Sequence, residues 1–408
     1  MRILCAAAAY PPHGRGGGPK ASEAVAKSLA GRGHTVRVIT VAGEETLEAR
    51  DGVEVKTIGG LNVYWNYWTE RPTITKLIWH ALENFNPRAY FRMRKEIAEF
   101  RPDLVMTISA ENVNVATWVA AKTMGYPVAH VIHSYFLMCW RGTMFSKGRN
   151  CPTQCWQCRI ASAGKKLCSQ VVDGVTSEAS HSMAKHRKNG FFRRALGMVI
   201  PGAVEPPSVI PDNVLPDTGP VRVGFIGMIA PVKGIGTLAD AAALLGPDAG
   251  FEYVIAGDGD SDFMAKLRAT FPSSTATFLG WTERDEFFRQ VDVVVVPSIW
   301  EEPFGNVAVE ALSYGVPVIA ARSGALPEIV QPDKSGLVFS PGDPHELGAC
   351  LRRLAEDRPL FRRLQKGALS RSRDYSPEKM ADALDSFVKQ VVDRRRQEPS
   401  SLPMDAQA

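Results

Sequence analysis

The sequence predicts an α/β protein made of two doubly wound, parallel-sheet domains. Three observations lead to this fold class. Short apolar runs alternate with amphipathic stretches along most of the 408 residues, which is typical of a parallel sheet covered by helices on both faces. A segment with six prolines, 201–220, interrupts this alternation near the middle of the chain. The alternation then starts again, so a second domain of the same kind is expected.

The expected elements of the first domain follow from its apolar runs. A glycine-rich loop after the first run precedes a helical pattern through Ala24, Val25 and Leu29. The runs themselves contain mostly aliphatic residues and are too short to be helices. They predict buried strands at residues 3–9, 35–41, 104–109, 128–133 and 171–176.

The second half repeats the pattern, with one helix expected around 237–245 and a last helix from 377 to about 395. Its strands are expected at residues 221–226, 252–256, 277–279, 291–296, 316–320 and 336–339. We therefore divide the chain into a first domain, 1–205, a second domain, 206–380, and a closing helix with a disordered tail, 381–408. Open α/β sheets bind ligands at the carboxyl ends of their strands, so a cleft between two facing domains is the expected active site.

Composition narrows the function classes. Hydrophobic residues make up 45% of the chain and charged residues 22%, as in globular proteins, which excludes a disordered chain. The net charge of +5 is too small to indicate a nucleic-acid partner. No run of 18 apolar residues occurs, and the first apolar run stops at Pro11-Pro12. We therefore expect a buried first strand rather than a targeting segment, and a cytoplasmic protein.

Residues 64–95 are rich in aromatic and basic side chains. In one interpretation the aromatic faces stack on sugars and the basic residues attract anionic lipid head groups, which would give peripheral contact with the inner membrane surface. In the other interpretation Leu77, Ile78, Leu82 and Phe85 form the buried face of a helix, because their spacing is helical. We favour the buried helix.

Two loops that follow strands carry residues suited to a phosphate site. Gly16 and Gly17 follow the first strand and precede a helix, so backbone N–H groups there can approach an anion. Lys233 follows the strand that ends at Gly227 and can supply a point charge for a diphosphate. Taken alone, the glycines are also explained by a tight turn and the lysine by ordinary surface exposure.

A third loop combines carboxylates with a bare helix start. Pro303 marks a helix beginning, and Gly305 leaves its first N–H groups accessible to a phosphate. Glu302 precedes this helix and Glu310 lies about two turns into it. The two carboxylates could hold sugar or ribose hydroxyls, whereas the structural alternative is a dipole contact for the first and simple exposure for the second.

In combination these segments resemble the retaining glycosyltransferases of family 4, which have the two-domain GT-B fold. Glu302 and Glu310 match the E-x7-E signature of that family. The segment from Gly227 to Lys233 is similar to its phosphate loop, and the Gly16-Gly17 loop is similar to its amino-terminal signature. The resemblance extends over nearly the whole chain. It implies transfer of a sugar from a nucleoside-diphosphate sugar to an acceptor, with the anomeric configuration retained.

The resemblance also implies a role for each matching residue. The catalytic residues would be His133, which follows the strand at 128–132, and Glu302, which would hold the transferred sugar. Lys233 would contact the diphosphate and Glu310 the ribose. The set implied for donor binding is Gly16, Gly17, Gly227, Lys233, Phe304, Gly305, Asn306 and Glu310. Because a lysine and helix-start amides can stabilise charge on a leaving diphosphate, we expect catalysis to need no cofactor.

The chain departs from the family pattern beside the phosphate loop. Met228 stands where the family usually has an arginine that contacts the diphosphate, and Arg15 or Arg141 is the expected replacement. The turn at 199–205 lacks the family's asparagine.

Four cysteines follow His133 along the chain. Cys139, Cys151, Cys155 and Cys158 have the spacing C-x11-C-x3-C-x2-C, which could supply four thiolates to a tetrahedral zinc ion in a reducing compartment. Disulfides or free thiols are the alternative, because this spacing fits no standard zinc ribbon. A closed zinc site has no open position for substrate, so we expect a structural zinc that shapes the acceptor loop.

Two other functions remain open. A nucleotide-sugar 2-epimerase has the same two-domain shape but would lack the Glu302 and Glu310 pair. A zinc-ordered, non-catalytic adaptor with a degenerate transferase fold would account for Met228 and the cysteines. For the transferase, the expected acceptor is a glycan, a lipid-linked saccharide or a small molecule, in a role such as polysaccharide biosynthesis. The sequence leaves the donor base and sugar open.

Overall fold

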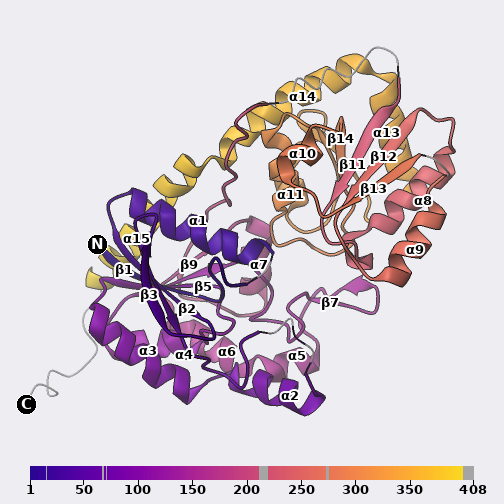
Figure 1. The fold of residues 1–408 in the computed structure, drawn as a ribbon. Helices are drawn as coiled ribbons and strands as arrows, with labels where there is room; N and C mark the ends of the chain where they lie inside the picture. Colours follow the sequence, from indigo (N-terminus) through magenta and orange to yellow (C-terminus); the bar gives the residue numbers. More distant parts are fainter. Residues whose placement is uncertain (15, 67–68, 70, 211–218, 273–274, 398–408) are drawn as a thin grey trace, which may run out of the picture.

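The computed structural model describes residues 1–14, 16–66, 69, 71–210, 219–272 and 275–397. These residues form two α/β domains, each with a central sheet of mainly parallel strands (Figure 1). The predicted fold class is therefore confirmed. Arg15, residues 211–218 of the proline-rich segment and residues 398–408 of the expected tail lie outside the described residues.

The first domain contains an eight-stranded sheet with the order β10-β9-β6-β5-β1-β2-β4-β3. All neighbouring strands are parallel except β3, which runs antiparallel to β4. Apolar side chains on both faces of β1, β5 and β6 are fully buried, which explains why their sequences are almost continuously apolar. The strands are β1 (Arg2–Ala7), β2 (Thr35–Val41), β3 (Thr46–Arg50), β4 (Val53–Ile58), β5 (Leu104–Ile108), β6 (Val128–Ile132), β9 (Gly174–Ser177) and β10 (Leu196–Val199).

The second domain contains a six-stranded, fully parallel sheet with the order β13-β12-β11-β14-β15-β16. The order reverses direction at β11 and β14, which places a topological switch point where these two strands end. The strands are β11 (Val221–Ile226), β12 (Phe251–Ala256), β13 (Ala276–Gly280), β14 (Val293–Val296), β15 (Val318–Ala321) and β16 (Gly336–Phe339).

Helices cover the faces of both sheets (Figure 1). None of the helices among the described residues is both long and apolar enough to cross a bilayer. The first domain has α1 (Gly17–Gly31), α2 (Thr73–Leu82), α3 (Pro87–Phe100), α4 (Ala116–Thr123), α5 (Trp156–Ala161), α6 (Ala163–Cys168) and α7 (Ser180–Lys188). The rest of the chain has α8 (Ile235–Leu245), α9 (Ser261–Thr270), α10 (Arg284–Phe288), α11 (Asn306–Ser313), α12 (Leu326–Ile329), α13 (Pro344–Glu356), α14 (Arg358–Ser372) and α15 (Pro377–Gln397).

Three strands of the first sheet, β3, β4 and β10, were not among the predicted strands. All five residues of β3 are exposed, so this edge strand has no apolar run to indicate it. In β4, the half-buried Lys56 forms ion pairs with Glu96 and Glu99 of α3. Partners of this kind lie far away in the sequence, which is why the local pattern did not predict the strand.

The last helix, α15, returns to the first domain. Figure 1 shows it in yellow, extending from the second domain to a position beside α1. Its buried residues Leu384, Phe387 and Val391 pack in the same core as strand β1. His34 Nε2, just before β2, lies 2.9 Å from Asp385 Oδ1 of this helix. The helix therefore holds the end of the chain against the domain where the chain began.

The interpretation of 77–85 as a buried helix face is wrong. Leu77 is 60% exposed, Ile78 46% and Phe85 40%. The inward side of α2 is instead filled by Trp79, whose ring stacks on Tyr64 and whose Nε1 atom donates to the Tyr64 carbonyl. Trp79 is therefore the residue that α2 buries, in place of Leu77, Ile78 and Phe85.

We expect Phe387→Ala to lower the free energy of unfolding by about 3–5 kcal/mol. The buried Phe387 ring extends from α15 into the core of the first domain, and its removal would leave a cavity there. The measurement is the midpoint of urea-induced unfolding. Gln390→Ala, on the exposed side of the same helix, is the control and should unfold like the natural protein. An equal loss in both variants would contradict this account of α15.

Candidate active site

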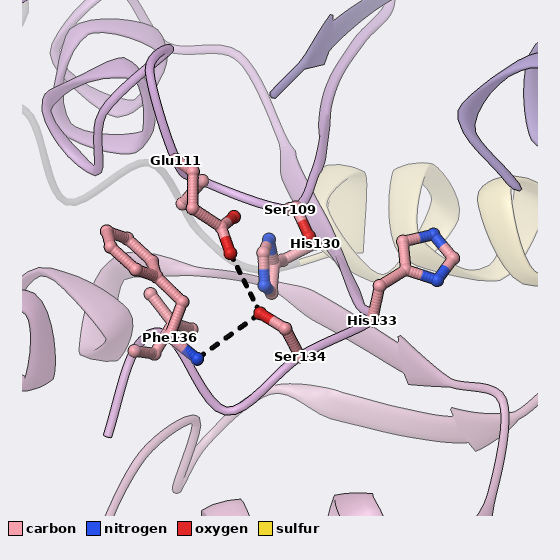
Figure 2. Close-up of a pocket in the computed structure, with 8 residues that line it drawn as sticks. Ser109, Glu111, His130, His133, Ser134 and Phe136 are labelled. Atoms are coloured by element: carbon pink, nitrogen blue, oxygen red, sulfur yellow. Dashed lines mark hydrogen bonds between the residues drawn. The ribbon is translucent and has the colours of Figure 1, made fainter. Parts of the chain in front are cut away.

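A pocket lies at the carboxyl ends of β5 and β6 in the first domain (Figure 2). Its floor contains His130, which is buried and paired with Thr107 Oγ1 at 2.7 Å, and is therefore a core residue. Its rim is formed by the loops that follow the two strands. The lining residues are Ser109, Ala110, Glu111, His130, His133, Ser134, Phe136 and Leu137. The predicted residue His133 thus lies where a parallel sheet is expected to bind a ligand.

His133 is held by a carboxylate that the sequence analysis did not identify. Its Nδ1 atom lies 3.0 Å from Glu178 Oε2, and its side chain is only 10% exposed. In the described part of the chain its other ring nitrogen, Nε2, is buried without a hydrogen-bond partner. A histidine held at one nitrogen and unpartnered at the other is oriented to contact something that is not part of the protein.

Two opposing effects act on the pKa of His133. Burial lowers it, but the charge and hydrogen bond of Glu178, together with the charge of Glu111, outweigh burial, so the pKa of His133 is raised. The ring therefore keeps its proton to higher pH than a free histidine does. Glu178 directly follows strand β9, and this position at a strand end is the only sequence signal that could have indicated it.

The opposite wall of the pocket is fixed by Glu111. Ser134 Oγ donates to Glu111 Oε1 at 2.8 Å and accepts from the Phe136 amide at 3.2 Å. Figure 2 shows His133 pointing away from this pair. The loop after β6 therefore presents His133 on one side and is tied to the loop after β5 on the other.

In the second domain the structure brings Lys233 and Glu302 together. Lys233 Nζ donates to Glu302 Oε1 at 2.7 Å, and Ser298 Oγ donates to the same oxygen at 2.6 Å. Lys233 Nζ also lies 4.9 Å from the centre of the Trp300 ring. Glu302 is only 7% exposed. The predicted diphosphate contact and the predicted sugar contact are therefore direct neighbours at the switch point of the sheet.

The start of α11 faces the glycine loop of the first domain. Gly305 is the residue before this helix and has φ 126°, a conformation that L side chains rarely adopt. Asn306 is exposed, and its Nδ2 atom would lie 3.2 Å from a methyl group placed on Gly17. Gly16, also with positive φ, precedes α1. Two helix starts, one from each domain, thus approach each other with little side-chain bulk between them.

Glu310 lies on α11, whereas Glu302 lies in the loop before this helix. Burial raises its pKa, while the charges of Arg284 and Lys20 act against this rise. Lys20 belongs to α1 of the first domain, so charges from both domains act on this carboxylate. Glu310 is half-buried, so the alternative of an ordinary exposed helix residue is wrong.

The remaining positions singled out from the sequence differ in how accessible they are. Gly227 has φ 145° and open space around its Cα atom, so its backbone is accessible. Met228, beside it, is 58% exposed. Phe304 is only 4% exposed and its ring packs 5.9 Å from that of Tyr375, so a donor contact from this residue would involve its backbone. Arg141 is exposed and bonds to Ser146 in the cysteine-containing loop.

The two domains are joined by polar contacts through α7. Lys185 donates to Glu301 Oε2, and His181 Nε2 lies 3.6 Å from the same oxygen. The contacts with His181 and Lys185 lower the pKa of Glu301 to about 2. Glu328 accepts hydrogen bonds from the Ser180 and His181 amides at 2.8 and 2.7 Å, which satisfies N–H groups at the start of α7.

The loop between the cysteines also contacts the second domain. It contains a short hairpin, β7 (Phe145–Ser146) and β8 (Arg149–Asn150), which Figure 1 shows reaching toward that domain. Asn150 donates to the Ile299 carbonyl at 2.7 Å and accepts from the Glu301 amide at 2.9 Å. Trp300 Nε1 donates to the Thr143 carbonyl at 2.6 Å. The loop therefore supports the segment that carries Glu302.

The cysteines themselves are free thiols. The contact with Cys158, together with backbone N–H groups, lowers the pKa of Cys139 to about 5. Contacts with the backbone and side chain of Cys158 also lower the pKa of Cys155. Cys151 is also close to them: burial and the charges of Cys139 and Cys155 raise the pKa of its thiol. Among the described residues, however, no three His, Cys, Asp or Glu side chains are arranged to hold a metal ion. The arrangement does not fit a zinc site as it stands, and structural zinc remains a prediction.

Comparisons with known proteins identify both halves of the chain. Residues 15–163 match Glycosyltransferase Family 4, and residues 220–357 match Glycosyl transferases group 1. An uncharacterized 42.6 kDa protein in the cps region of Klebsiella pneumoniae is 28% identical over 81% of this chain and 87% of that protein. Sulfoquinovosyl transferase SQD2 of Arabidopsis thaliana is 36% identical over 30% of this chain, and the match spans only 25% of that protein. A D-inositol 3-phosphate glycosyltransferase of Salinispora tropica is 32% identical over 42% of this chain and 39% of that enzyme.

Solved structures agree on the fold. Sucrose-phosphate synthase from Thermosynechococcus elongatus superposes with a TM-score of 0.73 at 19% identity, covering 97% of this chain and 100% of the other. Anabaena HepE in complex with UDP-glucose gives a TM-score of 0.68 at 19% identity, covering 96% and 100%. At these identities the likeness establishes the GT-B arrangement of the two domains.

We expect Glu178→Gln to lower the pKa of His133, because the variant removes the negative charge but keeps the side-chain volume and a hydrogen-bond acceptor. Between the two pKa values, the natural protein would carry a protonated ring and the variant a neutral one. The measurement is an NMR titration of the histidine ring protons.

Glu205→Gln, an exposed carboxylate on the interdomain segment, serves as the control. A His133 pKa that stays the same in Glu178→Gln would show that Glu178 does not set its protonation.

Proposed function

This chain belongs to the glycosyltransferases of family 4 and group 1, and we propose that it transfers a sugar from a nucleoside-diphosphate sugar to a saccharide acceptor with retention of configuration. The observation that carries the proposal is the Lys233–Glu302 pair beside the start of α11. A cation, a carboxylate and free helix-start amides meet there, and these are the groups that a sugar diphosphate requires.

The diphosphate would be bound by positive charge from the second domain. Lys233 Nζ can turn from Glu302 to a phosphate oxygen, which offers a charge-assisted hydrogen bond of comparable strength. Backbone N–H groups at Asn306 and beyond add the partial positive charge of the helix start. Gly227 and Gly17 leave room for the phosphates to approach the backbone from both domains. As the bond to the sugar breaks, these groups stabilise the charge that develops on the leaving diphosphate.

The sugar would be bound between Glu302 and His133. Once Lys233 has turned away, Glu302 still accepts from Ser298 and has a second oxygen for sugar hydroxyls. His133, protonated through Glu178, can donate from Nε2 to an oxygen of the sugar or phosphate. Glu302 would come close to an anomeric carbon that becomes positively charged, where a fixed carboxylate is favourable. Catalysis in this scheme uses only side chains and backbone amides, without a cofactor.

Glu310 would accept hydrogen bonds from the ribose of the nucleotide. It lies on the same helix as the diphosphate amides, and burial favours a hydrogen-bonded role for it over a solvated one. Related structures support a nucleotide-sugar donor of this kind, since HepE was solved with UDP and with UDP-glucose.

The acceptor would enter the pocket beside His133. The relatives that support a saccharide acceptor include WaaB, described as a lipopolysaccharide outer core galactosyltransferase. We therefore propose a glycan or lipid-linked saccharide, and a role in polysaccharide biosynthesis. The 2-epimerase and the non-catalytic adaptor are not favoured, because the family matches and the named relatives are glycosyltransferases.

The direct test of this function is a panel of UDP-, GDP- and ADP-sugars incubated with the purified chain and a series of saccharide acceptors. Release of nucleoside diphosphate that depends on the acceptor would support transfer. Loss of the donor without any acceptor product would support an epimerase, and failure of every nucleotide sugar to bind would overturn the proposal.

We expect Glu302→Gln to reduce kcat by about 100-fold or more while the protein stays folded, because the amide cannot supply the negative charge at the reacting sugar. Steady-state kinetics and circular dichroism test this together. Glu356→Gln, at the exposed end of α13, should behave like the natural protein. Near-normal turnover in Glu302→Gln would remove Glu302 from the mechanism.

We expect Lys233→Gln to weaken nucleoside-diphosphate binding by about 10- to 100-fold, which corresponds to loss of one charge-assisted hydrogen bond. Calorimetric titration with UDP, GDP and ADP measures this loss on whichever nucleotide binds. Lys266→Gln, exposed on α9, is the matched control. Unchanged affinity in Lys233→Gln would place the diphosphate elsewhere.

A further inference from the structure

Helix α2 has apolar side chains on both of its faces. Trp79 points inward and is only 5% exposed. Ile74, Leu77 and Ile78 lie on the other face and are 64%, 60% and 46% exposed. Their spacing, i, i+3 and i+4, makes one continuous stripe on the helix surface. A ten-residue surface helix would normally carry polar residues there, so this stripe needs a partner outside the domain core.

Helices α5 and α6 carry a second stripe of the same kind. Trp156, Ile160 and Leu167 are 70%, 68% and 74% exposed. With the exposed residue Ala163 they follow the spacing i, i+4, i+7 and i+11 across the two short helices.

The two stripes belong to neighbouring elements. Asn84, just after α2, donates to the Ala161 carbonyl at the end of α5 and accepts from the Gly164 amide in α6, both at 3.0 Å. The His80 ring of α2 also contacts the Trp140 ring at 5.7 Å between centres. We call the exposed surface of Ile74, Leu77, Ile78, Trp156, Ile160 and Leu167 the α2–α6 face.

The sequence segments that contain these helices carry a strong excess of positive charge. Residues 112–172 contain seven Lys and Arg and no Asp or Glu. Residues 71–95 contain six Lys and Arg and one acidic residue, Glu83, which is buried. The rest of the chain contains 35 basic and 42 acidic residues, so the excess of positive charge is confined to these two segments. Exposed basic residues such as Lys76 and Arg159 therefore surround the apolar stripes without acidic neighbours in the sequence.

We propose that the α2–α6 face binds the surface of an anionic phospholipid bilayer. Apolar side chains, including a tryptophan, would enter the boundary between head groups and acyl chains, and the basic residues would contact the anionic head groups. The absence of acidic residues from 112–172 favours this partner over a protein surface of mixed charge. No sugar transfer is needed for this binding, so the inference goes beyond the proposed function.

The position of the face would also serve the proposed function. Lys165 of α6 is buried and its Nζ donates to the Phe136 carbonyl in the pocket wall at 2.9 Å. Gln154, just before α5, donates to the Met138 carbonyl at 2.7 Å. The helices that would lie on the bilayer thus support the loop that lines the pocket. If the proposed function holds, a lipid-linked acceptor would reach the pocket from the same membrane.

The test is co-sedimentation of the full chain with vesicles. We expect binding to vesicles of phosphatidylglycerol and phosphatidylethanolamine, weaker binding at high salt, and little binding to pure phosphatidylcholine. Trp156→Ser should weaken binding about tenfold or more. Leu77→Ser, on the other stripe and away from the cysteines, should also weaken it.

Trp281→Ser is the matched control, because Trp281 is 72% exposed but belongs to the second domain, just after β13. This variant should bind vesicles like the natural chain. Absence of binding to anionic vesicles, or an equal loss in Trp281→Ser and Trp156→Ser, would overturn the proposal. Self-association in light scattering that Trp156→Ser abolishes would also overturn it, since a second copy would then cover the face. Vesicle binding and donor binding are measured separately, so either can fail alone.

Discussion

Two consecutive carboxylates after strand β14 determine how this molecule is assembled. Glu301 is turned toward Lys185 and His181 of the first domain, and Glu302 toward Lys233 and Ser298 of the second. The first contact connects the domains and the second forms the candidate donor site. Because adjacent residues share one backbone segment, the position of Glu302 depends on the interdomain contact of Glu301. The hairpin that bonds to Ile299 and Trp300 strengthens the same constraint.

The pocket beside His133 is connected to the same segment through the first domain. His133 is fixed by Glu178, and a methyl group on Gly202 would lie 2.5 Å from Glu178 Oε1 and 3.0 Å from the Phe304 ring. Glu178, which holds His133, and Phe304 in the loop before α11 therefore both pack against Gly202, where a larger residue would not fit. Helix α15 completes the connection by returning the chain to the core of the first domain. A site between two domains can only be preorganised when such contacts limit their relative motion.

Local sequence patterns predicted the parts of this structure that depend on local chemistry. The buried parallel strands, the bare start of α11 and the position of Lys233 follow from apolar runs, glycines and spacing. Glu178, Glu111 and Lys185 were missed, because each is defined by a partner more than twenty residues away. The exposed strand β3 has no apolar signal. Leu77 was assigned to a core that Trp79 fills, since helical periodicity cannot tell which of two apolar faces is buried.

We propose that Lys233 and Glu302 separate to receive the diphosphate and the sugar of one donor molecule. A crystal structure of the chain with a bound nucleotide sugar tests it most directly. We expect the diphosphate within hydrogen-bonding distance of Lys233 Nζ and the first amides of α11, and the sugar between Glu302 and His133. A donor bound away from Lys233, with the Lys233–Glu302 pair intact at 2.7 Å, would contradict it.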